Sequence, residues 1–139
     1  MEYRRFGSRI VMRLDKGDEI TQCLLAAAAK ERISMASVTG IGATDDFTVG
    51  IFDIDAKAYN RFTYTGNHEI TALAGNINTM NGEPYTHVHI TCAGPDGTVR
   101  GGHLLNAVIS LTCEIVIGIV DGSVDRKRDE TLGINKLSF

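Results

Sequence analysis

The sequence has no tryptophan, only two prolines and only three cysteines among its 139 residues. The cysteines are widely spaced, odd in number and each set in an apolar pattern, which argues against a disulfide framework and against a cysteine-rich metal site. We expect Cys23, Cys92 and Cys113 to be buried, reduced thiols. No segment approaches the roughly 18 apolar residues of a membrane span, and residues 1–6 have no apolar run behind their charges. We therefore expect a cytoplasmic protein with no membrane partner.

An excess of positive charge is also missing. The chain has 14 lysines and arginines against 17 aspartates and glutamates, which gives a formal net charge of −3. Proteins that hold nucleic acid through a general basic field show clustered Lys and Arg, so this balance argues against that class. The densest positive charge lies at the amino-terminal end, with Arg4, Arg5, Arg9 and Arg13. A solvated outer face of a sheet explains these arginines, and contact with an acidic partner is the alternative.

The length fits one domain over residues 1–139, long enough to bury a core without disulfide staples. A helix is predicted over residues 18–32, directly after an acidic turn whose carboxylates favour the positive end of the helix dipole. Its apolar residues recur at three-to-four spacing and form one narrow face: Ile20, Cys23, Leu24, Ala27 and Ala28. It is the only long helix that the sequence predicts.

Strands occupy most of the remaining chain. Alternating or short apolar runs predict strands over residues 8–14, 33–41, 47–54, 59–65, 69–77, 85–92, 98–104, 111–120 and 134–139, with a glycine-containing loop near residues 40–43. Most connections are too short for crossover helices, and several strands alternate apolar with polar residues, so the sheet should be mainly antiparallel. The fold class is therefore α+β, a mainly antiparallel sheet flanked by one long helix.

Three of the four histidines fall between residues 85 and 104. Successive side chains of a strand point to opposite faces, so His87 and His89 share a face and a returning strand could add His103. Three imidazoles with an open coordination position are the ligand set of a labile or catalytic zinc site. Nickel, copper or iron would accept the same ligands. Structural, hydrogen-bonded histidines are the alternative, and His68 is expected to face solvent in a turn.

The predicted hairpin sets a condition on this site. A plain two-residue turn that paired Gly94 with Gly97 would place His103 opposite Val88, on the wrong face. An odd-length loop, or a bulge at the glycines in positions 101 and 102, would return His103 to the face of His89.

Four further residues are candidates for the site. Glu69 could act as a general base on metal-bound water or fix the tautomer of a ligand, or it could simply pair with an arginine at a strand edge. Gly42, Asn76 and Arg100 form the candidate ligand-binding set. Asn76 could donate to a substrate oxygen or repair a backbone bond. Gly42 lies outside any Walker loop pattern, and Arg100 is also a candidate partner for Glu114, an acid set among apolar residues.

Short motifs follow one another along the whole chain in a fixed order: Val38-Thr39-Gly40-Ile41-Gly42-Ala43, Leu73-Ala74-Gly75-Asn76-Ile77, His87-Val88-His89-Ile90, Gly101-Gly102-His103-Leu104 and Thr112-Cys113-Glu114-Ile115. This order resembles the plant- and prokaryote-conserved (PPC) domain family, in its prokaryotic single-domain form. The resemblance implies a sheet of about seven strands beside one helix, homotrimeric assembly, a metal-bearing histidine set and the family label of predicted DNA-binding protein. Plant members carry AT-hooks before the domain, and this sequence contains no Arg-Gly-Arg-Pro hook.

Three functional classes stay open at this point. The first is a metal-binding module whose homotrimer builds sites for a small-molecule ligand or a regulatory partner. The second is a metal-dependent hydrolase or lyase, in which the open coordination position activates water. The third is DNA binding, which the family label suggests. One helix cannot cover both faces of a large sheet, so some apolar residues should be buried between subunits, among them Phe47, Val49, Ile51, Ile115, Ile117 and Ile119.

Overall fold

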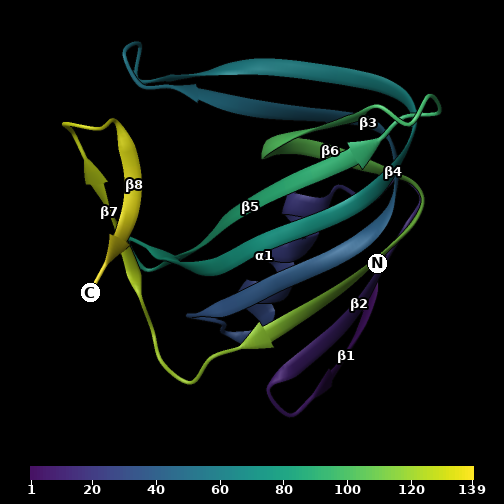
Figure 1. Ribbon diagram of the computed structural model, residues 1–139. Coiled ribbons are helices and arrows are strands. Elements are labelled where there is room, and N and C mark those ends of the chain that lie inside the picture. Colours follow the sequence, from purple (N-terminus) through teal and green to yellow (C-terminus); the bar gives the residue numbers. More distant parts are fainter.

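The computed structural model describes all 139 residues and contains eight strands and one helix (Figure 1). The predicted predominance of strands with a single helix is confirmed. The elements are β1 (Glu2–Phe6), β2 (Arg9–Asp15), α1 (Ile20–Glu31), β3 (Ala36–Asp53), β4 (Ala58–Met80), β5 (Glu83–Ala93), β6 (Val99–Ile119), β7 (Asp125–Asp129) and β8 (Ile134–Ser138).

The strands form one mixed sheet in the order β1-β2-β6-β3-β4-β7-β8, and β5 pairs with both β4 and β6. The pairings are antiparallel except for the contact between β4 and β7, which is parallel and consists of Thr79 opposite Asp125. Since β3 also pairs with β4 and with β6, the four strands β3 to β6 make a closed circuit of pairings. This closure brings the carboxyl-terminal half of β5 beside the beginning of β6.

Three predicted breaks in the sheet are wrong, because β3, β4 and β6 are long, bent strands that run through them. The loop expected near residues 40–43 lies inside β3, where the register shifts between Gly40 and Gly42. A Cβ atom on Gly42 would lie 2.6 Å from the Cα of Cys113, so glycine here lets β3 approach β6 closely. The expected turn before His68 lies inside β4 in the same way.

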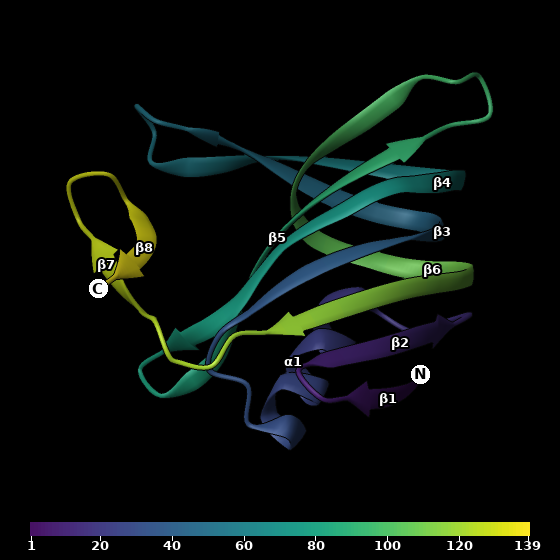
Figure 2. The ribbon, with the colours of Figure 1, turned by 60° about the horizontal axis from the view of Figure 1, so that its bottom comes forward.

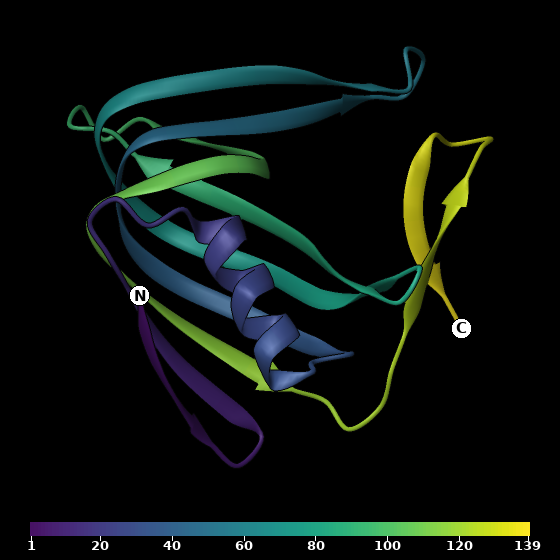
Figure 3. The same cartoon turned by 180° about the vertical axis from the view of Figure 1, so that it is seen from behind.

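Helix α1 is shorter than expected at both ends. The Glu19 carboxylate accepts hydrogen bonds from the backbone N–H groups of Thr21 and Gln22 at 3.1 and 2.7 Å, which caps the first turn. Arg32 has φ of 54°, in the left-handed region, and ends the helix. The predicted apolar face is confirmed and packs on one face of the sheet (Figure 3). This helix is the only one in the fold, and it lacks the length and hydropathy to cross a membrane.

The core lies between α1 and the sheet and contains 25 buried apolar residues, the three cysteines among them. The expectation of buried, unpaired thiols is confirmed. Burial raises the pKa of both Cys92 and Cys113 to about 12. Phe47, Val49, Ile115 and Ile117 are also inside this core, so they are not the surplus that we expected between subunits.

The sheet face away from α1 carries its own apolar residues. Val11, Val116 and Ile41 come from β2, β6 and β3, and their side chains are 50%, 36% and 57% exposed. Leu111 on β6 is 71% exposed. A real apolar surplus therefore exists, on a face that the helix leaves uncovered.

The β7–β8 hairpin stands apart from the body of the sheet at the end of the chain segment that leaves β6 (Figure 2). The long arm made by the end of β3 and the start of β4 reaches toward it, and the Lys57 ammonium donates to the carbonyl oxygen of Glu130 at 3.3 Å (Figure 1). No strand was predicted over β7, because its Asp-Arg-Lys-Arg-Asp sequence has no apolar residue to show alternation.

Candidate metal centre

The β5–β6 hairpin sets the position of the third histidine. Its register pairs His89 with His103 and continues without a shift to Ala93 opposite Val99, so that residues 94–98 form an odd-length connection. The sequence required an odd-length loop or a bulge to return His103 to the face of His89. The structure has the odd-length loop and no bulge at Gly101 and Gly102. Directly opposed residues of two strands share a face, so His103 joins His89.

The glycines around the histidines allow close approach of the backbone. A Cβ atom on Gly101 would clash with the carbonyl oxygen of Ile90 and lie 2.7 Å from the Cγ2 of Thr91. On β4, a Cβ atom on Gly75 would clash with the carbonyl oxygen of His87 and lie 2.6 Å from the Cα of Val88. Glycine at these positions keeps β5 tight between β4 and β6.

The three imidazole rings converge on the sheet face away from α1. Their centroids are 5.3 Å apart for His87 and His89, 5.1 Å for His87 and His103, and 5.5 Å for His89 and His103. One nitrogen from each ring lies within 4.8 Å of the other two. Tetrahedral zinc with bonds of about 2.0–2.1 Å needs nitrogens roughly 3.3 Å apart, so small ring movements bring all three onto one ion.

His103 is the most perturbed of the three. Burial, with smaller contributions from His87 and His89, lowers its pKa to about 4. Burial likewise lowers the pKa of His87, with Arg126 as the next cause. Buried Nδ1 of His103 has no hydrogen-bond partner. Neutral rings with free lone pairs are the form that a metal requires, so the residues present fit a divalent ion.

Aromatic and polar residues frame the cluster. The ring of Tyr59, near the start of β4, stacks on His103 at a centroid distance of 4.9 Å and an angle of 21°. Arg126 on β7 places its Nη2 3.4 Å from the Nδ1 of His87, and the same nitrogen donates to the Oδ1 of Asn76 at 3.0 Å. Neither Tyr59 nor Arg126 was predicted from the sequence, because only the folded arm and the β7–β8 hairpin bring them to β5 and β6.

A family model described as the Plants and Prokaryotes Conserved (PCC) domain matches residues 1–121. The chain belongs to the PCC domain family. The resemblance stated from the sequence motifs is thereby confirmed.

Several solved structures are similar to this PCC domain. A "putative DNA-binding protein" from Bacteroides thetaiotaomicron has 32% identity and a TM-score of 0.96, with 99% of this chain and 96% of that chain covered. A plant- and prokaryote-conserved protein from Pyrococcus horikoshii has 26% identity and a TM-score of 0.88, covering 99% and 94%. A metal-containing protein from Archaeoglobus fulgidus has 27% identity and a TM-score of 0.87, covering 99% and 97%. A search of curated proteins found no match.

The structure brings only one of the four other candidate residues of the PCC domain to the histidines. Asn76 lies opposite His87 in the register and reaches the cluster through Arg126. Glu69 lies opposite Ala93, five positions along β4 from Ala74, the partner of His89, which is about 15 Å of extended strand. We therefore assign Glu69 no role at the histidines.

The other two candidates have local structural contacts. The guanidinium of Arg100 lies over the ring of Tyr64, 5.2 Å from its centroid. Gly42 serves the close approach of β3 and β6 described above. Glu114 faces solvent on the outer side of β6, so the expectation that it needs an arginine partner is wrong. His68 is not in a turn, and its ring packs edge-on against Phe47 at 5.1 Å.

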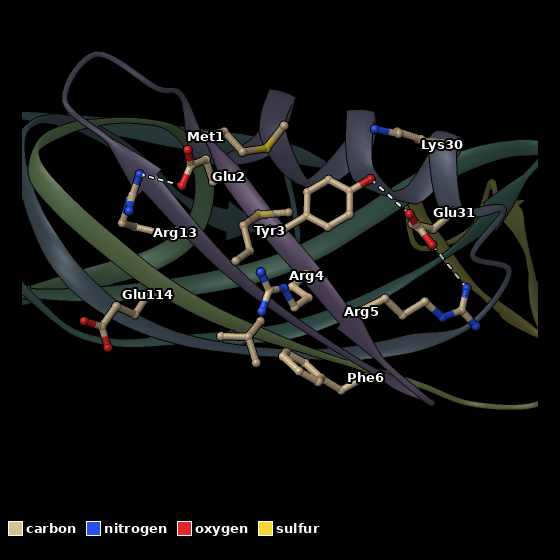
Figure 4. A pocket seen from close by; sticks show the side chains of 12 residues that line it. Met1, Glu2, Tyr3, Arg4, Arg5, Phe6, Arg13, Lys30, Glu31 and Glu114 are labelled. Carbon is tan, nitrogen blue, oxygen red and sulfur yellow. Dashed lines mark hydrogen bonds and ion pairs between the residues drawn. The ribbon is translucent and has the colours of Figure 1, made fainter.

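Two of the four arginines at the amino-terminal end, Arg5 and Arg13, are paired with carboxylates (Figure 4). Arg5 pairs with Glu31 at 3.2 Å, and Arg13 pairs with Glu2 at 3.0 Å and with Asp15 at 2.8 Å. These pairs form within the chain and reduce the free positive charge at this end, where Arg4 and Arg9 take part in no ion pair.

The buried histidines predict a pH dependence of stability in the metal-free protein. The pKa of His103 is about 4 in the folded protein, against about 6.5 in an unfolded chain. Between these values the unfolded state holds more protons, so the free energy of unfolding falls as the pH falls from about 6.5 to about 4. We expect a loss of about 2 kcal/mol between about pH 7.5 and about pH 5 in urea unfolding.

The variant His103→Gln should lose most of this dependence, since glutamine does not titrate. Aspartates and glutamates titrate at lower pH and contribute little above about pH 5. Equal unfolding free energies for the metal-free wild type at the two pH values would contradict the burial of a neutral His103.

Proposed function

We propose that this PCC protein binds one divalent transition metal ion per chain through His87, His89 and His103. The observation that carries the proposal is the convergence of three imidazoles within 4.8 Å on one sheet face, with the buried Nδ1 of His103 lacking any partner. A buried polar atom without a partner costs about 1–3 kcal/mol, which a bound ion would offset. The three ligands leave an open coordination position for a small molecule.

Zinc is the metal that we place first, because three imidazoles suit it and zinc tolerates an open position. Nickel, copper and iron are accepted by the same ligands and depend on availability. The metal-containing protein from Archaeoglobus fulgidus supports a metal in this fold at 27% identity. The three unpaired, buried cysteines support a reducing, cytoplasmic location.

We also propose that the protein assembles as a homotrimer through the sheet face away from α1. The apolar residues exposed there in one chain are Val11, Ile41, Leu111 and Val116. A contiguous apolar area of this kind marks an interaction surface in a soluble protein. Light scattering at micromolar concentration should give the mass of three chains, and a stable monomer would contradict this assembly.

Metal analysis tests the proposed function. The purified protein, loaded with zinc and dialysed against buffer, should retain about one equivalent per chain, because a three-ligand site holds zinc against dialysis. The triple variant that replaces all three histidines with alanine should retain almost none while keeping its fold. Retention of a full equivalent by that variant would place the metal elsewhere.

We rank metal binding above metal-dependent hydrolysis or lysis because Glu69, the acid considered as a general base, lies opposite Ala93, about 15 Å of extended strand from the partner of His89. Of the candidate ligand-binding set we retain only Asn76, through its hydrogen bond with Arg126, and we add Arg126 itself.

DNA binding is the second candidate, and the names of similar structures favour it. The net charge of −3 and the pairing of Arg5 and Arg13 with carboxylates predict only weak binding. We expect no specific gel shift at about 0.15 M salt, because phosphate contacts by Lys and Arg carry non-specific affinity. A shift that persists at this salt concentration with one sequence and not another would make DNA binding the primary function.

A further inference from the structure

Arg126 is a buried cation without an anionic partner. Its side chain is 4% exposed and takes part in no ion pair. Its hydrogen bonds go to neutral acceptors only: the Oδ1 of Asn78 at 2.8 Å, the carbonyl oxygen of Asn135 at 2.7 Å and the Oδ1 of Asn76 at 3.0 Å. The ring of Tyr85 lies 4.9 Å from the guanidinium carbon. Buried charges in proteins are normally paired, so this guanidinium lacks the counter-charge that its environment calls for.

The hydrogen bond from Arg126 to His87 cannot persist when His87 binds a metal ion. A guanidinium only donates, so the Nδ1 that lies 3.4 Å from its Nη2 must offer a lone pair. A neutral imidazole that binds a metal uses one nitrogen as ligand and carries its proton on the other. Nδ1 is then either bound to metal or protonated, and in neither case can it accept from Arg126. Metal binding therefore frees one N–H of a buried guanidinium.

The charges around the cluster are all positive or neutral. A divalent ion and Arg126 together bring three positive charges, and the histidines, asparagines and tyrosines around them are neutral. No carboxylate hydrogen-bonds to Arg126 or to the histidines. The site as built has no negative charge of its own.

We propose that the ligand of this centre is a small oxyanion, a carboxylate or a phosphate, that occupies the open metal position and accepts the freed N–H of Arg126. This inference rests on the proposed metal binding. Guanidinium groups bind carboxylate and phosphate oxygens through charge-assisted hydrogen bonds, and a buried one is held in place to do so. Asn76 and Asn78 fix the orientation of Arg126, so they are positioning residues.

The β7–β8 hairpin gains a function from this assignment. Arg126 lies beyond residues 1–121, the part of the chain that the family model matches. The hairpin pairs with the body of the sheet through Thr79 and Asp125 alone and is braced by the contact of Lys57 with Glu130. Anion selection at the metal would thus be supplied by a segment outside the matched region.

Cobalt-loaded protein tests the proposal, because the visible absorption of cobalt responds to a new ligand. Inorganic phosphate and acetate are titrated separately into wild type, Arg126→Gln and Arg128→Gln. Arg128 is the matched control, since it lies on the same strand, carries the same charge and is exposed. Calorimetry with metal-free wild type measures whether either anion binds without metal.

In wild type, at least one anion should change the cobalt spectrum with saturation, and the tighter of the two identifies the ligand as phosphate or carboxylate. Arg126→Gln should weaken that anion at least about tenfold, which corresponds to one charge-assisted hydrogen bond, whereas Arg128→Gln should change it less than about twofold. Arg126→Lys keeps the charge, and its anion affinity is measured in place of that of Arg126→Gln if the glutamine variant folds poorly. The metal-free protein should bind the anion at least about tenfold more weakly.

Failure of this inference is distinguishable from failure of the proposed function. A wild type that takes up no cobalt or zinc overturns both. A metal-loaded wild type whose spectrum is insensitive to both anions, or equal anion affinities in wild type and folded Arg126 variants, overturns the anion site and leaves metal binding intact.

Discussion

Replacing His103 with alanine is expected to lower the affinity for zinc on the order of a hundredfold or more. Loss of one of three protein ligands leaves two imidazoles, whereas even removal of a residue that merely orients a ligand costs about 10–100-fold. His103 is also the ring that is most buried among the three and the one whose Nδ1 has no partner. Competition with a zinc-binding dye measures the affinity of each variant.

His68→Ala is the matched control for this prediction. His68 is the one histidine outside the cluster, and its ring contacts Phe47 and the carbonyl oxygen of Gly66. Its removal should leave zinc affinity unchanged within about twofold, because it contributes no ligand. Equal losses of zinc affinity in His103→Ala and His68→Ala would mean that the cluster of His87, His89 and His103 is not the zinc site.

The variant Gly75→Ala is expected to destabilise the protein by about 3 kcal/mol or more. The added methyl group would clash with the carbonyl oxygen of His87 and approach the Cα of Val88 to 2.6 Å. These are backbone atoms of a central strand, so β4 and β5 must separate, and overpacking of this kind costs typically 1–3 kcal/mol and sometimes more. Urea unfolding of the metal-free protein gives the loss.

Gly94→Ala is the control for the glycine effect. A Cβ atom there would meet only side-chain atoms, the nearest being the Oδ1 of Asp96 at 3.2 Å, in the loop between β5 and β6. We expect a change below about 1 kcal/mol. If Gly75→Ala is no less stable than Gly94→Ala, the close approach of β4 to β5 is not a feature of the protein in solution.

The histidine cluster could be predicted from the sequence because it depends on short-range rules. Alternation along a strand places His87 and His89 on one face, and a count across the hairpin shows which loop lengths bring His103 to the same face. In the structure, an odd-length loop brings His103 to the face of His89. The helix face and the buried thiols were predictable for the same reason, since both follow from local spacing.

The parts that sequence analysis missed depend on contacts between distant segments. The loop expected near Gly40 and Gly42 is a continuous strand, because pairing of β3 with β4 and β6 determines its path more strongly than the local glycines do. The polar sequence of β7 gives no alternation, so Arg126 could not be placed on a strand or beside His87. The surplus of apolar surface was expected correctly, but its residues depend on which face α1 covers.

The central claim is that three imidazoles hold one metal ion, and X-ray absorption spectroscopy at the zinc edge tests it most directly. Zinc-loaded protein should show three imidazole nitrogens at about 2.0–2.1 Å, with the multiple scattering that imidazole rings give, and one further oxygen or nitrogen. Sulfur scattering at about 2.3 Å would assign the metal to cysteines, and fewer than three imidazoles would contradict the proposed site.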